Sequence, residues 1–235
     1  MSSHPDRRIR GFTLIEISIV IALIGFMLGG VVMTVGVQRR QQQETEVRRT
    51  LADIREALIG FAASRPEGVP YLPCPDTTGD GVENRGSVNC AQAEGRLPWV
   101  SLGLGDSDSW GNRFRYRVSP EFSANGGFGL SAMGVLRVCL RSGCASGELL
   151  AERIPAVVVS HGRNGWGAWR VGGGSAPAPS SSDELENADG SDDFVSREHS
   201  DAGGALGEFD DRLVWLSPHV LKHRMLQLGR LPEAF

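Results

Sequence analysis

The chain has 235 residues, a formal net charge of -4 and 40% hydrophobic residues. This charge is small, and the basic residues of the chain are interspersed with acidic ones. The sequence therefore predicts no nucleic-acid partner. Outside residues 11–37 the chain is rich in Gly, Ser, Asp and Arg and poor in aromatic residues. The composition therefore excludes a large apolar core and favours a modest domain with long loops.

An apolar segment, residues 12–37, follows the short basic N-terminus. At about 1.5 Å per residue, a helix of this length can cross a hydrocarbon layer of roughly 30 Å. We therefore predict a transmembrane or filament-core helix over residues 12–37 that contacts the lipid bilayer. Arginines lie on both sides of the segment, at positions 7, 8 and 10 and at positions 39 and 40, so charge alone leaves its orientation undecided.

The position of one small residue separates this N-terminus from an ordinary secretory signal, in which the cleavage site follows the apolar stretch. Here Gly11 precedes that stretch, within the segment RGFTLIE at residues 10–16. These residues resemble the signal of type IV prepilins and type II secretion pseudopilins. The resemblance implies that residues 1–11 are a leader, that prepilin peptidase cuts after Gly11 at the cytoplasmic face, and that Phe12 becomes an N-methylated N-terminus.

Glu16 is the one ionisable residue in the apolar segment. A carboxylate at this depth in a membrane costs several kcal/mol unless it finds a partner. Cleavage after Gly11 would leave an amine on Phe12, with which the Glu16 carboxylate of a neighbouring subunit could pair. The resemblance likewise implies a role for Glu16 in subunit assembly. The alternative is a plain signal anchor whose carboxylate reaches the lipid headgroups.

The helical pattern continues beyond the apolar segment, through residues 38–65. Apolar side chains recur there at steps of three and four residues, at Val47, Leu51, Ile54, Leu58 and Phe61. Pro66 predicts the end of the helix near position 64. We expect an α+β fold in which this amphipathic helix packs on a small antiparallel β-sheet, with long loops and a short C-terminal helix. A free coiled coil is the alternative, but the heptad pattern lasts only about two repeats.

The globular domain is predicted over residues 66–235. Its four cysteines form two local pairs, Cys74 with Cys90 and Cys139 with Cys144. An even count in local pairs suits disulfides, which places this domain in an oxidising compartment such as the periplasm. In the chain-entropy model the first bridge would contribute roughly 3 kcal/mol.

The loop after Cys74 partly matches the opening of a calcium-binding loop, through Asp76, Thr78 and Asp80. Its third position lacks a carboxylate and its twelfth lacks a glutamate. The alternative is a polar turn in which the aspartates accept hydrogen bonds from nearby amides. Calcium is the one cofactor that the sequence suggests.

A turn at Trp110-Gly111-Asn112 leads into a predicted strand in which Phe114, Tyr116 and Val118 share one face. This stretch resembles the Asp-x-Trp-Gly-Asn-x-x-x-Tyr segment of type II secretion pseudopilins, with Ser109 where proline is common. Trp110 is expected to pack in the domain or to contact another subunit. Further strands are predicted at residues 136–140, 154–160 and 212–216.

Two segments of the C-terminal half have distinctive composition. Residues 172–208 are rich in Gly, Ser, Pro and acids, and predict an exposed, mobile loop. Residues 219–228 predict a short helix, for which Ser217 and Pro218 provide the start and Gly229 the end. Its apolar face is expected to comprise Val220, Leu221, Met225 and Leu228.

Catalysis is not expected. His161 follows Ser160, but neighbouring residues on a strand point to opposite faces and the sequence places no acid beside them. Trp166 and Trp169 could form an aromatic contact patch, or pack as half-buried strand residues.

The resemblance implies a structural subunit of a type IV pilus or type II secretion filament. It also implies that the chain crosses the inner membrane once and that its C-terminal domain lies in the periplasm. Its implied partners are other pilin or pseudopilin subunits, prepilin peptidase and an inner-membrane assembly platform. The acidic loop and the C-terminal helix favour a minor subunit. Two alternatives remain: a membrane-anchored periplasmic binding protein that recognises a ligand through its tryptophans or its Asp loop, and a membrane-anchored hydrolase that uses His161.

Overall fold

The computed structural model describes residues 11–65, 69–145 and 147–231, without the side chains of residues 28–35 and 37. The chain divides into two compact units, residues 1–44 and residues 45–235. We describe each unit separately. The predicted leader, residues 1–11, lies outside the described residues except for Gly11.

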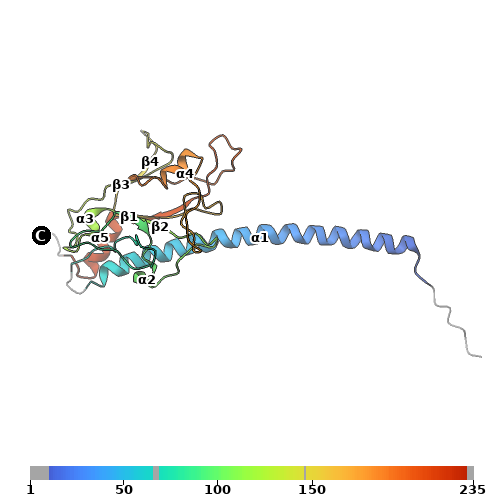
Figure 1. The fold of residues 1–235 in the computed structure, drawn as a ribbon, viewed down its shortest axis with the longest axis horizontal. Helices are drawn as coiled ribbons and strands as arrows, with labels where there is room; N and C mark the ends of the chain where they lie inside the picture. The colour runs from blue at the N-terminus through green and yellow to red at the C-terminus, as the bar shows by residue number, and fades with distance from the viewer. Residues whose placement is uncertain (1–10, 66–68, 146, 232–235) are drawn as a thin grey trace, which may run out of the picture. The chain divides into compact units, whose positions relative to one another are not determined.

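The longest element is helix α1, Leu14–Ala63, which runs from the first unit into the second (Figure 1). The predicted stop near position 64 is confirmed, since the Ser64 amide donates to the Gly60 carbonyl at 3.0 Å as the helix ends. Within the second unit, the predicted apolar stripe of α1 is buried: Val47, Leu51, Ile54, Leu58 and Phe61 are all 8% exposed or less.

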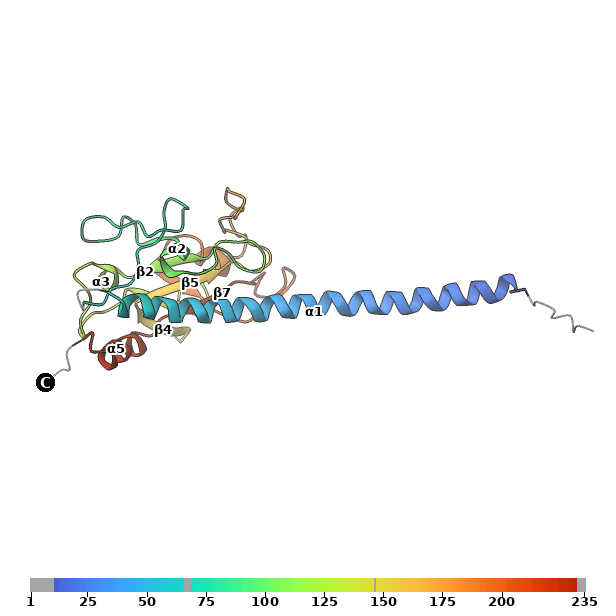
Figure 2. The same ribbon diagram turned by 90° about the horizontal axis from the view of Figure 1, so that it is seen from below.

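This part of α1 packs on a four-stranded antiparallel sheet in the order β1-β2-β5-β7. The strands are β1, Glu94–Arg96; β2, Arg115–Val118; β5, Ala156–Ser160; and β7, Arg212–Trp215. Figure 2 shows β2, β5 and β7 running beside α1. The predicted face of the β2 segment meets the helix, because Phe114, Tyr116 and Val118 belong to the same core as the α1 stripe. The predicted α+β class, with its helix on an antiparallel sheet, is confirmed.

The sequence did not predict a second sheet. It has three strands in the order β4-β3-β6, with β3 (Leu136–Cys139) antiparallel to β4 (Leu149–Ile154) and parallel to β6 (Asp193–Val195). Its core includes Leu136, Val138, Ile154 and Phe194, together with Val157 and Val159 of β5. Strand β5 therefore contributes to two cores, one from each face.

The prediction of an exposed loop over residues 172–208 is wrong in its centre. Helix α4, Ser182–Glu186, and strand β6 lie there, and Asp183, Glu184 and Phe194 are buried. The prediction was made from composition, which assumes that acidic residues are exposed to solvent. Here Asp183 is paired with Arg197, with its carboxylate 2.6 Å from the guanidinium.

The described part of the domain has three further helices: α2, Trp99–Leu102; α3, Pro120–Ser123; and α5, Pro218–Gln227. Figure 2 shows α5 beside the C-terminal part of α1, with which Leu221 and Met225 share the main core. Two of the four residues predicted for its apolar face are instead exposed, Val220 and Leu228. Val220 is turned about 100° from Leu221 around the helix axis, and Leu228 is the C-cap beyond the last helical residue.

Candidate functional site: the N-terminal segment

The first described residues are exposed and precede helix α1. Among the described residues, nothing beyond its chain neighbours lies within 4 Å of the position that a Cβ of Gly11 would occupy, and Phe12 is 76% exposed. The backbone between Gly11 and Phe12 is therefore open to another protein. A protease that cuts at this bond would meet no steric barrier from the described residues.

Thr13 and Glu16 together cap the N-terminus of α1. The Glu16 amide donates to Thr13 Oγ1 at 3.3 Å, and the Thr13 amide donates to Glu16 Oε2 at 3.4 Å. This reciprocal pair is a capping box, which satisfies amide groups that the first helical turn leaves without partners. The capping role of Glu16 was not predicted from the sequence, although the spacing Thr-x-x-Glu is the signal for it.

Beyond this cap, most side chains of α1 up to residue 27 are apolar. Residues 11–27 are all exposed, including Leu14 at 87% and Phe26 at 87%. Part of the predicted span, residues 28–35 and 37, lies outside the described side chains. Among the residues that the structure describes, no helix is both long enough and apolar enough to cross a membrane.

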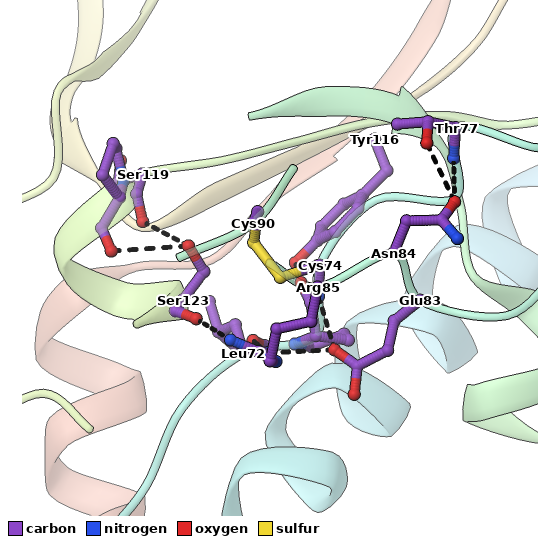
Figure 3. The surroundings of a disulfide bond; sticks show 12 residues. Leu72, Cys74, Thr77, Glu83, Asn84, Arg85, Cys90, Tyr116, Ser119 and Ser123 are labelled. Carbon is purple, nitrogen blue, oxygen red and sulfur yellow. Dashed lines mark hydrogen bonds and ion pairs between the residues drawn. A yellow bond between two sulfur atoms is a disulfide. The ribbon is translucent and has the colours of Figure 1, made fainter. Parts of the chain in front are cut away.

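In the globular domain, both cysteine pairs form disulfides, Cys74–Cys90 and Cys139–Cys144. Figure 3 shows the surroundings of the first bridge, where Arg85 connects separate segments. Its guanidinium donates to the carbonyls of Leu72 and Ser123 and to the Glu83 carboxylate. The same carboxylate accepts from the Cys74 amide at 2.9 Å. These contacts fix the loop as part of the fold.

The loop suggested for calcium has a turn built around Asp76. This residue is fully buried, and its carboxylate accepts hydrogen bonds from the amides of Thr78, Gly79 and Gly81 at 2.6–2.9 Å. Asp80 accepts from the Val82 amide at 2.9 Å, and this bond is the main cause of its lowered pKa. Such contacts are those of the polar turn that was the alternative to a metal loop.

Ser160 and His161 point to different partners, as predicted from the strand geometry. Ser160 Oγ donates to Asp108 Oδ2 at 2.6 Å, whereas His161 Nε2 accepts from Arg115 Nε at 3.2 Å. Burial raises the pKa of Asp108, against the lowering effect of its hydrogen bonds. Among the described residues, no histidine accepts a hydrogen bond from the Ser160 hydroxyl. It does place an acid near His161, Asp211, which the sequence did not.

Two of the predicted tryptophans, Trp110 and Trp169, make contacts within the domain. Trp110 contacts the main core, and Trp169 lies under the guanidinium groups of Arg96 and Arg115, at 4.9 and 4.5 Å from the ring centre. Trp166 is half-buried. Both guanidinium groups therefore make cation–π contacts with Trp169 from within the same domain.

The chain was compared with known families. Residues 6–32 match the model of the prokaryotic N-terminal methylation motif. The chain carries a prepilin-type signal. This signal is that of type IV pilins and pseudopilins, and the match includes Gly11, Phe12 and Glu16. Neither the comparison with curated proteins nor that with solved structures gave a match.

The prepilin-type signal explains the features seen at the N-terminal end of the described chain. It indicates a structural protein associated with a membrane and assembled with other pilin subunits, which fits the expectation that the chain is not an enzyme. Residues 6–10 of the signal lie outside the described residues. The exposed Gly11–Phe12 bond, the capping box and the exposed apolar helix all fall within it.

Proposed function

We propose that this chain is a structural subunit, a minor pilin or pseudopilin, of a type IV pilus or type II secretion filament. It is made as a prepilin, and prepilin peptidase removes residues 1–11. Phe12 then becomes the N-methylated end of the mature subunit. The observation that carries the proposal is the prepilin-type signal, whose helical part, residues 14–27, has exposed apolar side chains.

The exposed apolar side chains of residues 14–27 must be buried against lipid or another protein. Burying a Leu, Ile or Phe side chain is favourable by about 1.5–3 kcal/mol, so a helix that is apolar all round is not stable in water by itself. A lipid bilayer can provide the cover before assembly, with residues 12–37 as a single inner-membrane span and the domain in the periplasm. Equivalent helices of neighbouring subunits can provide it within a filament. An inner-membrane assembly platform would move the helix between the two.

Glu16 has a defined place in this proposal. Cleavage converts the Phe12 nitrogen from a peptide nitrogen into a charged amine. The Glu16 carboxylate has capacity for several hydrogen bonds, of which the Thr13 amide uses one on Oε2. The carboxylate of one subunit can therefore accept the amine of the next while its own capping box persists. Pairing inside an apolar filament would set the register of the helices, because an unpaired buried charge is costly.

The proposal of a minor position rests on the domain. A shaft subunit packs against itself many times, which favours a compact outline. This domain adds a second sheet and exposed stretches at residues 171–175 and 201–206. A subunit present in few copies can accommodate such additions more easily than one that must repeat along a shaft.

Mass spectrometry of the N-terminus of the protein from its native membrane tests the processing step. The expected mature chain begins at a methylated Phe12. An intact Met1, or a start beyond residue 37, would overturn the proposal.

A second experiment tests assembly. Glu16→Gln should leave membrane insertion and cleavage intact but strongly reduce incorporation into filaments, measured by immunoblotting sheared filaments against the membrane fraction. The matched control is Glu46→Gln, an exposed residue of the same helix outside the signal. Equal incorporation of the two variants contradicts the proposed pairing.

A further inference from the structure

Two histidines lie one helical turn apart on helix α5, Pro218–Gln227. His219 and His223 are four residues apart in the sequence, and both are exposed. Residues at this spacing lie on the same side of an α-helix, with Cβ atoms about 5–6 Å apart. The two imidazole rings are therefore neighbours on the surface of the domain.

The core fixes the direction in which this pair of histidines faces. Leu221 and Met225 are fully buried in the main core, so they define the inner side of α5. At about 100° per residue, the middle of the histidine pair lies about 160° around the helix axis from the middle of these two residues. The histidines are thus on the side of α5 that faces away from the core.

Neither imidazole of the pair makes a hydrogen bond or an ion pair with any residue that the structure describes. The other two described histidines do have polar neighbours. His161 accepts a hydrogen bond from Arg115 at 3.2 Å. His199 lies 3.4 Å from a carboxylate oxygen of Asp201. Residues 212–231 include no Asp or Glu, so α5 itself offers no carboxylate to the pair. The ring nitrogens of both residues are available to a ligand.

The two basic residues nearest to the pair leave α5 in other directions. Lys222 Nζ donates to the carbonyls of Leu130 and Ala132, at 2.7 and 2.6 Å, which holds its charge against a neighbouring loop. Arg224 is exposed, but its position lies about 120° around the helix axis from the middle of the histidine pair. A cation bound between the two imidazoles would therefore not meet a positive charge on the same side of the helix.

Two neighbouring imidazoles can act together as ligands for a transition-metal ion. Imidazole nitrogen binds zinc at about 2.0–2.1 Å, so two such nitrogens on one ion are about 3–3.5 Å apart. Rings whose Cβ atoms are about 5–6 Å apart can reach this separation by rotation about their side-chain bonds. Imidazole suits copper, zinc and nickel, whereas calcium and magnesium prefer oxygen ligands.

The histidine pair offers two protein ligands. Among the described residues, the one group of three or more His, Cys, Asp or Glu side chains whose ligand atoms all lie within 4.8 Å of one another is a buried carboxylate cluster, Glu184, Asp210 and Asp211. Neither histidine belongs to this cluster. An ion on His219 and His223 would therefore keep its remaining coordination positions for water or for a ligand from another molecule.

We propose that His219 and His223 bind one copper(II) or zinc ion, with one ring nitrogen each. Copper(II) should bind more tightly than zinc, because it has the highest affinity among the divalent first-row metals. The ion would hold one turn of α5 from the outside, while Leu221 and Met225 hold it from the core. This inference is independent of the proposed filament function.

The test uses the full-length protein in detergent micelles, with His4→Gln in every sample so that the histidine outside the described residues does not contribute. All solutions contain excess calcium chloride, which competes for carboxylate oxygens but not for imidazole nitrogens. Copper chloride is added up to one equivalent. Electron paramagnetic resonance should show copper bound to two imidazole nitrogens, and isothermal titration should give about one site per chain. Zinc chloride should displace the copper only in excess.

Removal of either histidine tests whether the two act as a pair. His223→Gln should leave one imidazole nitrogen on the copper and weaken binding at least about tenfold, since losing a group that only orients a ligand already costs about 10–100-fold. His219→Gln should do the same. Both residues are exposed, so neither change should shift the midpoint of thermal unfolding in the absence of copper.

A spacing control separates chelation from the number of histidines. His223→Gln combined with Arg224→His keeps two histidines on α5 but places them five residues apart, about 140° around the helix axis. This variant should bind copper as weakly as His223→Gln alone. His199→Gln, at an exposed histidine outside α5, should keep wild-type affinity.

Three results would overturn the site. These are a copper spectrum without two imidazole nitrogens in the folded protein, wild-type affinity in both His219→Gln and His223→Gln, and wild-type affinity in the spacing control. Zinc that binds more tightly than copper contradicts the expected order of the metals.

Discussion

Tyr116 shows how one side chain connects the core to the disulfide loop. It is fully buried in strand β2, and its hydroxyl donates to the Pro73 carbonyl at 3.0 Å, next to the Cys74–Cys90 bridge (Figure 3). Burial raises its pKa well above 10, and the charge of Glu83 adds to this effect while Arg85 opposes it. The phenol therefore keeps its proton in the folded state at a pH where the unfolded chain would lose it.

The sign of the resulting pH dependence follows directly. Above pH 10 the unfolded state binds fewer protons than the folded state, so the free energy of unfolding falls as pH rises, by up to about 1.4 kcal/mol per pH unit. Tyr116→Phe should lower stability modestly at pH 8, through loss of the hydrogen bond, but flatten the decline between pH 10 and 11. Urea titrations at several pH values measure both effects.

Tyr71→Phe is the control for this prediction, because Tyr71 is half-buried and is the other of the two tyrosines. It should leave the decline above pH 10 in place. Equal slopes for wild type and Tyr116→Phe would show that the buried phenol does not govern alkaline stability.

At the scale of elements, helix α5 provides a matched pair of leucines. Leu221 is fully buried in the main core, whereas Leu228 at the C-cap is 57% exposed. Leu221→Ala should reduce the free energy of unfolding by about 2–5 kcal/mol, through lost burial and a cavity, and Leu228→Ala by less than about 0.5 kcal/mol. Urea unfolding followed by tryptophan fluorescence measures the difference. Similar losses for the two variants would mean that α5 does not pack through the Leu221 face.

The elements that could be predicted are those with a long, regular signal. The apolar stripe of α1 was predictable because five apolar residues keep helical spacing. The β2 segment was predictable because three apolar residues, beginning with Phe114, alternate with polar ones. Helix α4 and strand β6 could not be predicted in this way. Each has five residues or fewer and carries acids whose partners are distant in sequence. Asp183, for example, is buried only because Arg197 reaches it.

The same limit applies to the N-terminal signal and to the cluster of buried carboxylates in the domain. Gly11, Phe12 and Glu16 are contiguous, so their pattern is visible in the sequence and matches a family model. His161, Glu184 and Asp211 come together only after three segments have folded against one another. Two adjacent acids at the start of a predicted strand were the one local sign of this cluster.

At the scale of the whole domain, β5 joins the two cores. All five of its residues are buried, with Ala156 and Val158 in the core under α1, and Val157 and Val159 in the core of the second sheet. An uninterrupted apolar run is typical of a strand covered on both faces. The two cores therefore share one backbone, and loss of either exposes one face of β5.

This sharing predicts that the globular domain unfolds as one unit. Val157→Ala removes a side chain from the second core only, and should cost about 1–3 kcal/mol, since it deletes two buried methyl groups. Hydrogen exchange should then show that the slowest amides of β2 and β7, in the first sheet, lose protection by the same free energy as those of β3 and β6. Val135→Ala, at a residue 49% exposed beside the second sheet, is the control and should change neither set. If the amides of β3 and β6 exchange faster while those of β2 and β7 keep their protection, the second sheet opens by itself and β5 does not couple the cores.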